Sequence, residues 1–268
     1  MLTWSLRLDF EFLSGLHNMP FPGKIYFIVC KYSIYLKSRF CGARQGLNSV
    51  MVFGGRFHYN DMYGLASLQR VYCASHTLKG LLPGNAVIVE VGANIGQFNH
   101  FGRHYLGARR IISIEPVMES FELLQRNASV PSDCLRCAVS DVEGDVLFHV
   151  AQESSQLSSY VADENSSYRD SYLVPARRLD SIAAEMKIDR IDLLKIDTEG
   201  SELDVLKSAG KLLSVTDLIL VEMSVFRNSS GNIFKIGSFL EEKGFTLVEL
   251  SSASGRRPKD VDGVFKRV

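Results

Sequence analysis

No stretch of this 268-residue sequence is long and apolar enough to cross a membrane. The most hydrophobic region outside the predicted core strands runs from Lys24 to Phe40, and Lys31 divides it before about 20 apolar residues can accumulate. A secretory signal peptide is also lacking, because Arg7, Asp9 and Glu11 interrupt the apolar N-terminus. We therefore expect a cytoplasmic protein without a transmembrane segment. The region 24–40 is expected to be a helix packed on the domain or on a second subunit, which we favour over a helix lying at a membrane surface.

The sequence has no excess of charge of either sign. Its 30 Lys and Arg residues balance 30 Asp and Glu residues, so no overall field attracts nucleic acid or an acidic membrane. The five cysteines are odd in number and irregularly spaced, which argues against a disulfide framework. Cys134 and Cys137 form a CxxC pair, but no second ligand pair at zinc spacing accompanies them. A small, specific ligand is the expected partner.

Length and patterning indicate one α/β domain with an N-terminal appendage. We expect residues 1–64 to form a partly helical appendage that contacts substrate or a second subunit, and residues 65–268 to form the main domain. From about Tyr72 onward, strand-like and helix-like segments alternate, as in a parallel sheet with helices on both faces. We predict strands at 87–91, 111–114, 135–139, 192–196, 218–222, 246–250 and 263–266, and helices at 97–105, 118–127, 179–186, 201–209 and 233–243. The short loop between the last two strands predicts an antiparallel hairpin edge.

An insertion at about 141–178 interrupts the alternation between the third and fourth strands. It begins with a turn at Glu143-Gly144 and a strand at 145–150. Its middle, 152–172, is rich in Ser, Asp, Glu and Tyr and has too little apolar content to be core. We expect either a surface loop or a lid that orders over a ligand, and its position beside the expected pocket favours the lid.

Acidic residues follow two predicted strands at the place where open α/β sheets bind ligands. VIVEVGANIG, at 87–96, breaks from a strand into a glycine-containing turn, with Glu90 near the strand end. DLLKIDTEGSELDVLKSAG, at 192–210, places several carboxylates between a strand and a helix. A dinucleotide fingerprint is absent, because Asn94 and Gln97 occupy the positions of the second and third glycines counted from Gly92. A phosphate-free ligand fits this turn better.

Five segments in this order resemble the FkbM family of S-adenosylmethionine-dependent methyltransferases, from about Leu65 to the C-terminus. They are EVGANIG, ISIEPVMESFELLQRN, RCAVSDVEGDVLF, RRLDSIA and LLKIDTEGSELDVLKSAG, of which KIDTEGSELDVLK is the most specific. The resemblance implies a seven-stranded Rossmann-like class I methyltransferase sheet, S-adenosylmethionine as cofactor, and O-methylation of a hydroxyl on a sugar, glycan or natural-product acceptor. Nothing in the residues excludes nitrogen as the acceptor. Thr198 and Ser208 depart from the family pattern without removing a carboxylate.

The predicted cofactor site combines the glycine-containing turn with acids at strand ends. Glu90 can pair with the cofactor ammonium, and backbone amides near Asn94 and Ile95 can meet its carboxylate. Glu115, about 20 residues after the turn, can accept hydrogen bonds from both ribose hydroxyls. The resemblance places Ala138 against the adenine. The predicted cofactor-binding residues are Glu90, Gly92, Ala93, Asn94, Gly96, Glu115, Ala138 and Asp197.

The catalytic candidates are Asp197, Glu199 and Glu222. Methyl transfer requires alignment of the acceptor and removal of its proton, and Asp197 and Glu199 stand where the acceptor should lie. Strand alternation puts Lys195 on the same face as Asp197, where it can keep this carboxylate ionised or contact the acceptor. Glu202 either joins this cluster or only favours the helix N-terminus. We assign no metal, although these carboxylates leave a divalent ion open.

Two other functions share this fold. A non-catalytic methyltransferase-like binding protein would lose the cofactor acids, and an NAD-dependent oxidoreductase would carry the third glycine. The retained acids Glu90, Glu115 and Asp197 argue against the first alternative. His100 and His104, four apart on a predicted helix, are expected on a solvated helix face rather than in a metal or base site.

Overall fold

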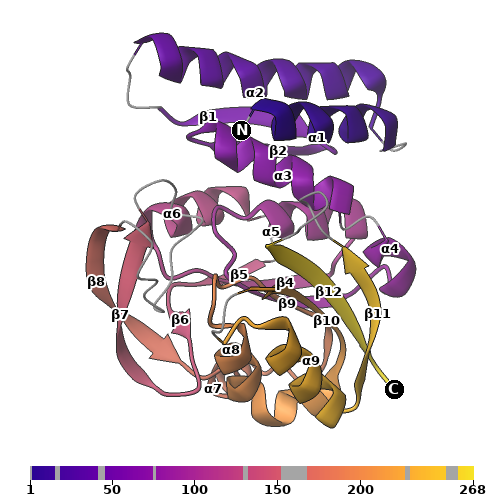
Figure 1. Ribbon diagram of the computed structural model, residues 1–268, viewed down its shortest axis with the longest axis vertical. Coiled ribbons are helices and arrows are strands. Elements are labelled where there is room, and N and C mark those ends of the chain that lie inside the picture. The colour runs from indigo at the N-terminus through magenta and orange to yellow at the C-terminus, as the bar shows by residue number, and fades with distance from the viewer. Residues whose placement is uncertain are drawn as a thin grey trace.

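The computed structural model describes residues 2–15, 19–41, 46–74, 77–128, 132–151, 168–226, 230–251 and 259–268. Its centre is a seven-stranded sheet with the strand order β11-β12-β10-β9-β3-β4-β5 (Figure 1). The strands are β3 (Val87–Val91), β4 (Arg110–Ile114), β5 (Ser132–Leu135), β9 (Ile191–Ile196), β10 (Thr216–Ser224), β11 (Phe245–Ser251) and β12 (Asp260–Arg267). The five strands from β5 to β10 pair in parallel, whereas β12 runs antiparallel to both β10 and β11. The predicted antiparallel hairpin edge is confirmed.

Helices cover both faces of the sheet, because alternate side chains of its buried strands point to opposite sides. Ile88 and Leu193 join one hydrophobic cluster, and their neighbours Val89 and Leu194 join the other. One face is covered by α3 (Met62–Ala74), α4 (Leu78–Leu81), α5 (Gln97–Phe101) with the π-helix Gly102–Leu106, and α6 (Met118–Asn127). The other face is covered by α7 (Leu179–Glu185), α8 (Glu202–Ala209) with the 3₁₀ turn Gly210–Val215, and α9 (Ile233–Glu242).

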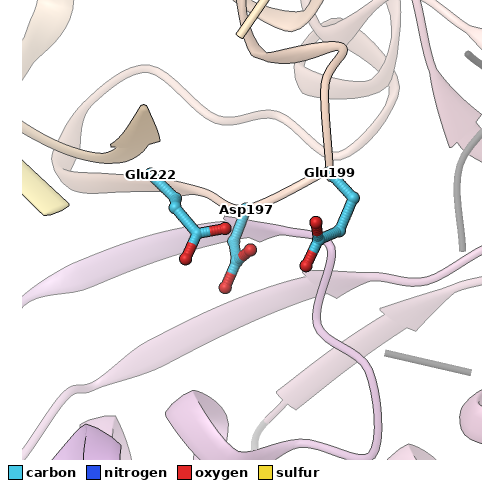
Figure 2. Close-up of side chains that lie close together, drawn as sticks. All are labelled: Asp197, Glu199 and Glu222. Atoms are coloured by element: carbon cyan, nitrogen blue, oxygen red, sulfur yellow. The ribbon is translucent and has the colours of Figure 1, made fainter. Parts of the chain in front are cut away.

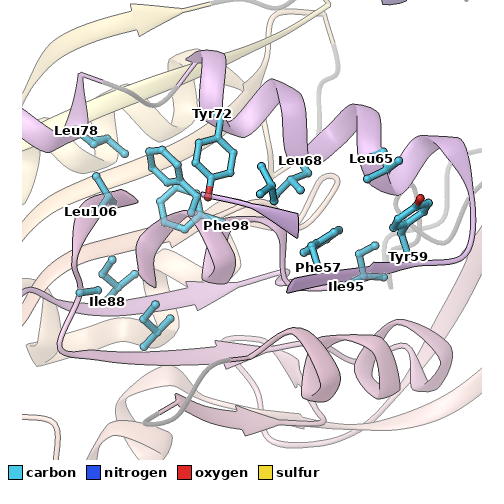
Figure 3. Close-up of a cluster of buried hydrophobic side chains, with 14 of the residues drawn as sticks. Phe57, Tyr59, Leu65, Leu68, Tyr72, Leu78, Ile88, Ile95, Phe98 and Leu106 are labelled. Carbon is cyan, nitrogen blue, oxygen red and sulfur yellow. The ribbon is translucent and has the colours of Figure 1, made fainter. Parts of the chain in front are cut away.

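The N-terminal segment packs on the first face and extends its core. It contains α1 (Leu2–Gly15), α2 (Phe21–Cys41) and the hairpin β1 (Asn48–Val52)–β2 (Gly55–Tyr59). Phe12, Phe27 and Phe57 are fully buried in the same cluster as Tyr72 and Ile88. Figure 3 shows this cluster, with side chains of α3 facing those of β2 and α5. No helix in the described ranges is long and apolar enough to span a membrane.

The predicted third strand, 135–139, is wrong in its bounds. The sheet strand is β5, and Leu135 is its last residue; the chain then leaves the sheet at the exposed Arg136. The next residues form β6 (Ala138–Val139), which pairs with β8 (Tyr168–Arg177) in a separate three-stranded sheet completed by β7 (Gly144–Ala151). Residues of one apolar segment therefore belong to strands of two different sheets. The hydrophobic pattern is continuous across the segment, so it does not show where one strand ends and the next begins.

The insertion contains a β-hairpin as well as polar sequence. The predicted strand at 145–150 is confirmed within β7, whereas residues 168–172, predicted as part of a loop or lid, belong to β8 and pair antiparallel with β7. Val174 and Ala176 of β8 are buried against Phe148 and Val117. The rest of the predicted lid, 152–167, lies outside the described residues.

Candidate active site

A cavity opens at the carboxyl ends of β3, β4 and β9, the expected ligand side of an open α/β sheet. The predicted site residues that line it are Glu90, Gly92, Ala93, Asn94, Glu115, Ala138, Asp197, Glu199 and Glu222. Helix α3 contributes Ser67 and Arg70 to the lining of the same cavity. The structure thus brings together residues at the ends of β3, β4, β9 and β10, Ala138 of β6, and residues of the first-face helices α3 and α5.

Glu90 is the most deeply buried carboxyl group at the cavity. Only 1% of the residue is exposed, and its Oε2 accepts a hydrogen bond of 3.0 Å from the Ser113 hydroxyl. The Lys195 ammonium lies 4.0 Å from its Oε1. Burial raises the pKa of Glu90 to about 7, and Lys195 and Ser113 oppose this rise only in part. The carboxyl group is therefore poised to ionise when a cation enters the cavity.

Glu115 fastens the turn after β3 to the end of β4. One of its oxygens accepts a hydrogen bond from the amide of Asn94 at 2.8 Å and the other from the amide of Val117 at 2.9 Å. Burial raises the pKa of Glu115 to about 7 despite these two donors. The Asn94 amide, which we predict to meet a ligand carboxylate, donates here to Glu115, because the tight turn brings the two groups together.

The two glycines of the turn have different roles. Gly92 has a φ of +80°, and a Cβ there would lie 1.8 Å from the carbonyl oxygen of Asp197. The close approach that requires this glycine is therefore between two strand-end loops. Gly96, at φ +89°, packs against Leu124 and Asn127 of α6 and is not among the residues that line the cavity.

Asp197, Glu199 and Glu222 form an acidic cluster at the ends of β9 and β10. Figure 2 shows their side chains side by side and projecting in the same direction. One carboxylate oxygen from each lies within 4.8 Å of the others. Glu199 has a φ of +55°, an unusual conformation for a residue with a side chain, so the loop holds it under strain.

Neighbouring charges and burial shift the pKa values of Asp197 and Glu222 in opposite directions. Burial alone would raise the pKa of Asp197, but the Lys195 ammonium, 3.0 Å away, together with the charge of Arg70 and a hydrogen bond with Glu222, lowers it below its usual value. Burial, and then the charges of Asp197 and Glu199, raise the pKa of Glu222 well above its usual value. Of these two coupled groups, Asp197 is therefore the one that ionises more readily, and Glu222 the one that keeps its proton to higher pH. The predicted pairing of Lys195 with Asp197 is confirmed.

Arg70 and Asp262 belong to the same site, and sequence reasoning missed both. Arg70 of α3 donates to Glu222 at 3.3 Å and to Asp262 at 3.2 Å. Glu222 and Asp262 are direct cross-strand neighbours on β10 and β12, where like charges repel. Burial opposes ionisation of Arg70, but these two carboxylates raise the pKa of its guanidinium. The signal in the sequence is the predicted hairpin, whose second strand, 263–266, begins directly after Asp262.

Comparison with known proteins identifies the family. The family model described as "Methyltransferase FkbM domain" matches residues 90–247, more than half of the chain. The chain belongs to the FkbM methyltransferase family. Among curated relatives, Methyltransferase sdnD of Sordaria araneosa is 27% identical over 62% of this chain and 76% of its own length. Methyltransferase 1 of Beauveria bassiana is 24% identical over 62% of this chain and 74% of its own length.

A solved structure supports the fold of this FkbM methyltransferase. The FkbM methyltransferase from Methylobacillus flagellatus KT is 17% identical and matches with a TM-score of 0.50 over 76% of this chain. The match spans 54% of that protein, so this chain covers about half of its length. The predicted fold class, a seven-stranded Rossmann-like methyltransferase sheet, is confirmed. Arg70 and Asp262 lie outside the family-matched residues, which places part of the cavity wall beyond the FkbM domain.

Glu202 organises the acidic loop of the methyltransferase. The residue is buried, and its Oε1 accepts hydrogen bonds from the amide of Thr198 at 3.2 Å and the amide of Gly200 at 2.9 Å. It also accepts one from the Thr198 hydroxyl at 3.2 Å. Burial raises the pKa of Glu202 above its usual value. Glu202 stabilises the loop around Glu199 through these hydrogen bonds and does not line the cavity.

The prediction that His100 lies on a solvent-exposed helix face is wrong. The His100 side chain is fully buried, its Nδ1 lies 3.0 Å from the Tyr72 hydroxyl, and its ring packs edge-on against Phe57. Burial lowers the pKa of His100 to about 3, so the ring is neutral. The hairpin and α3 cover this helix face, and the sequence gives no sign that they would.

Proposed function

We propose that this methyltransferase transfers a methyl group from S-adenosylmethionine to a hydroxyl on a sugar, glycan or natural-product acceptor. The observation that carries the proposal is that Glu90, Glu115 and Asp197 line one cavity at the ends of three adjacent parallel strands. Glu90 and Glu115 bind the cofactor, and Asp197 lies where the acceptor hydroxyl meets the transferred methyl group.

The donor set of the cavity fits this cofactor. Glu90 is buried and has a pKa of about 7, so an incoming ammonium favours its ionised form. Glu115 retains lone pairs for the ribose hydroxyls while it holds the turn. Cys137, Ala138 and Val139 form an apolar part of the wall that suits a flat base. S-adenosylmethionine supplies an electrophilic methyl group on its sulfonium.

Asp197 is the proposed general base for the acceptor hydroxyl. Lys195 favours the ionised form of Asp197, which can take a proton, while Glu222, whose pKa is raised, keeps its own proton to higher pH and donates a hydrogen bond to Asp197. Arg70 holds Glu222 against Asp262 and fixes the acceptor side of the cavity. These contacts align the acceptor oxygen, and alignment provides much of the catalysis in a displacement of this kind.

Cofactor affinity is expected to depend on pH. Burial raises the pKa of Glu90 and Glu115 from 4.5 to about 7, so the ligand-free protein loses stability as pH rises between these values. Cofactor affinity should increase as pH rises, because the cofactor ammonium pairs with the ionised form of Glu90. Affinity for S-adenosylhomocysteine should rise from about pH 6 to about pH 8 in calorimetric titrations. Glu90→Gln should bind more weakly and with a shallower pH dependence; a pH-independent wild type would contradict the assignment.

Catalysis is expected to be independent of added metal. Carboxylates of the cluster are ligands that Mg²⁺ accepts, but Lys195 and Arg70 already supply positive charge to Asp197 and Glu222. Treatment with EDTA should therefore leave methyl transfer within about twofold of the untreated rate. Loss of activity that Mg²⁺ restores would instead assign an ion to the cluster.

The direct test is transfer of a labelled methyl group. The purified protein is incubated with methyl-labelled S-adenosylmethionine and panels of sugars, glycans and hydroxylated natural products, with matched amines in a parallel panel. Label in a hydroxylated acceptor, absent with Asp197→Asn, supports the proposal. Label in amines alone would change the acceptor class, and binding of NADH instead of the cofactor would favour an oxidoreductase.

A further inference from the structure

Gln97 begins α5 at the wall of the cavity, and the nitrogen of its side-chain amide has no hydrogen-bond partner in the described part of the chain. The residue is 5% exposed, and its Nε2 is buried without a hydrogen-bond partner among the residues that the structure describes. Buried polar side chains nearly always find partners. An unpaired amide at a cavity wall therefore points to a ligand group that completes its hydrogen bonds.

The loop before Gln97 has few donors left for a ligand. Four of its backbone amides donate within the protein: those of Gly92, Ala93, Asn94 and Gly96. The first two share the carbonyl of Ile114 at 3.0 Å, and the third reaches Glu115 at 2.8 Å. Most of the backbone donors of 92–96 are therefore in use, and a side-chain donor would add to those that remain for a ligand carboxylate.

The two cations at the cavity are also engaged. Lys195 lies 3.0 Å from Asp197, and Arg70 lies 3.3 Å from Glu222. Each of these positive charges already faces a protein carboxylate. The Gln97 amide, in contrast, is neutral, so it can meet an anionic oxygen without breaking an existing ion pair.

We propose that the side-chain amide of Gln97 donates to the carboxylate of the amino-acid part of the cofactor. The inference rests on the proposed function. The nitrogen and oxygen of the terminal amide exchange places by a half-turn, which lets the N–H group face the cavity. Glu90 then pairs with the ammonium, and Gln97 donates to the carboxylate. The two residues together bind both charged groups of the amino-acid part.

Two ligands separate this contact from the rest of the cofactor site. S-adenosylhomocysteine carries the amino-acid group, whereas 5′-methylthioadenosine keeps the adenine and ribose and lacks it. In calorimetric titrations, Gln97→Met should weaken S-adenosylhomocysteine binding by about tenfold to a hundredfold, the range for a hydrogen bond to a charged group. Its affinity for 5′-methylthioadenosine should stay within about twofold of wild type. Glu115→Gln is the matched control and should weaken both ligands, because both carry the ribose.

Folding is monitored by thermal melting of the ligand-free variants. Gln97→Met should melt no lower than wild type, because it removes an unpaired buried amide. Gln97→Glu provides a second variant, whose carboxylate would repel the ligand carboxylate and again spare 5′-methylthioadenosine. Equal losses for both ligands, or no loss for either, would overturn the inference. A wild-type protein that binds neither ligand would refute the cofactor assignment itself.

Discussion

Replacing Asp197 with asparagine is expected to lower kcat by roughly 10²–10⁴-fold, the usual contribution of a general base. Asparagine keeps the shape of the side chain and can still accept a hydrogen bond from Lys195, 3.0 Å away, but it cannot take a proton. The measurement is the rate of labelled methyl transfer to the first acceptor identified. Affinity for S-adenosylhomocysteine should change far less than kcat, and thermal melting measures what buried Lys195 loses with the charge of its partner.

Glu222→Gln is the matched control for this prediction. Because the pKa of Glu222 is raised well above its usual value, glutamine imitates the protonated form that this shift favours. We expect a loss of about tenfold or less, arising from altered contact with Arg70. A larger effect of Glu222→Gln than of Asp197→Asn would make Glu222 the base. A small effect of both would indicate an acceptor that needs no base.

Gly92→Ala is expected to have the largest effect on stability. The added methyl group would lie 1.8 Å from the Asp197 carbonyl oxygen, and the backbone at φ +80° is unfavourable for alanine. Neither β3 nor β9 can move away easily, because they are adjacent central strands. We expect a loss of about 4 kcal/mol or more, seen as a fall in Tm of roughly 10 °C or more, together with loss of cofactor binding.

Gly237→Ala is the matched glycine control. Gly237 lies inside α9, where an added Cβ meets no atom within 4 Å. Alanine should stabilise this helix by about 0.5–1 kcal/mol. If Gly92→Ala instead melted like Gly237→Ala and kept its affinity for S-adenosylhomocysteine, the contact between the two strand-end loops would not constrain the site.

Local patterns predict most of the sheet, because its central strands are short apolar runs bounded by turns. The strand 87–91 and the helix 118–127 are predictable to the residue from such patterns. The third strand is not, since the apolar run that ends β5 continues into β6 of another sheet. The buried state of His100 is equally invisible, because it depends on a hairpin distant in the sequence.

The same distinction applies to the site. Glu90, Glu115 and Asp197 are predictable because parallel strands bring their carboxyl ends to one edge of the sheet. Arg70 comes from a helix of the first face, and Asp262 enters through cross-strand pairing with Glu222. Such contacts depend on tertiary packing, for which one sequence carries no local signal. The occupied Asn94 amide is a further example, since only the folded turn brings it to Glu115.

The most direct test of the cofactor assignment is calorimetric titration with S-adenosylhomocysteine, in parallel with NADH, of the wild type and of Glu115→Ala. We expect the wild type to bind S-adenosylhomocysteine and not NADH. Glu115→Ala should bind it at least about tenfold more weakly, because the ribose loses an acceptor and the turn loses its anchor at Asn94. Binding of NADH alone, or S-adenosylhomocysteine binding that Glu115→Ala leaves unchanged, would contradict the assignment.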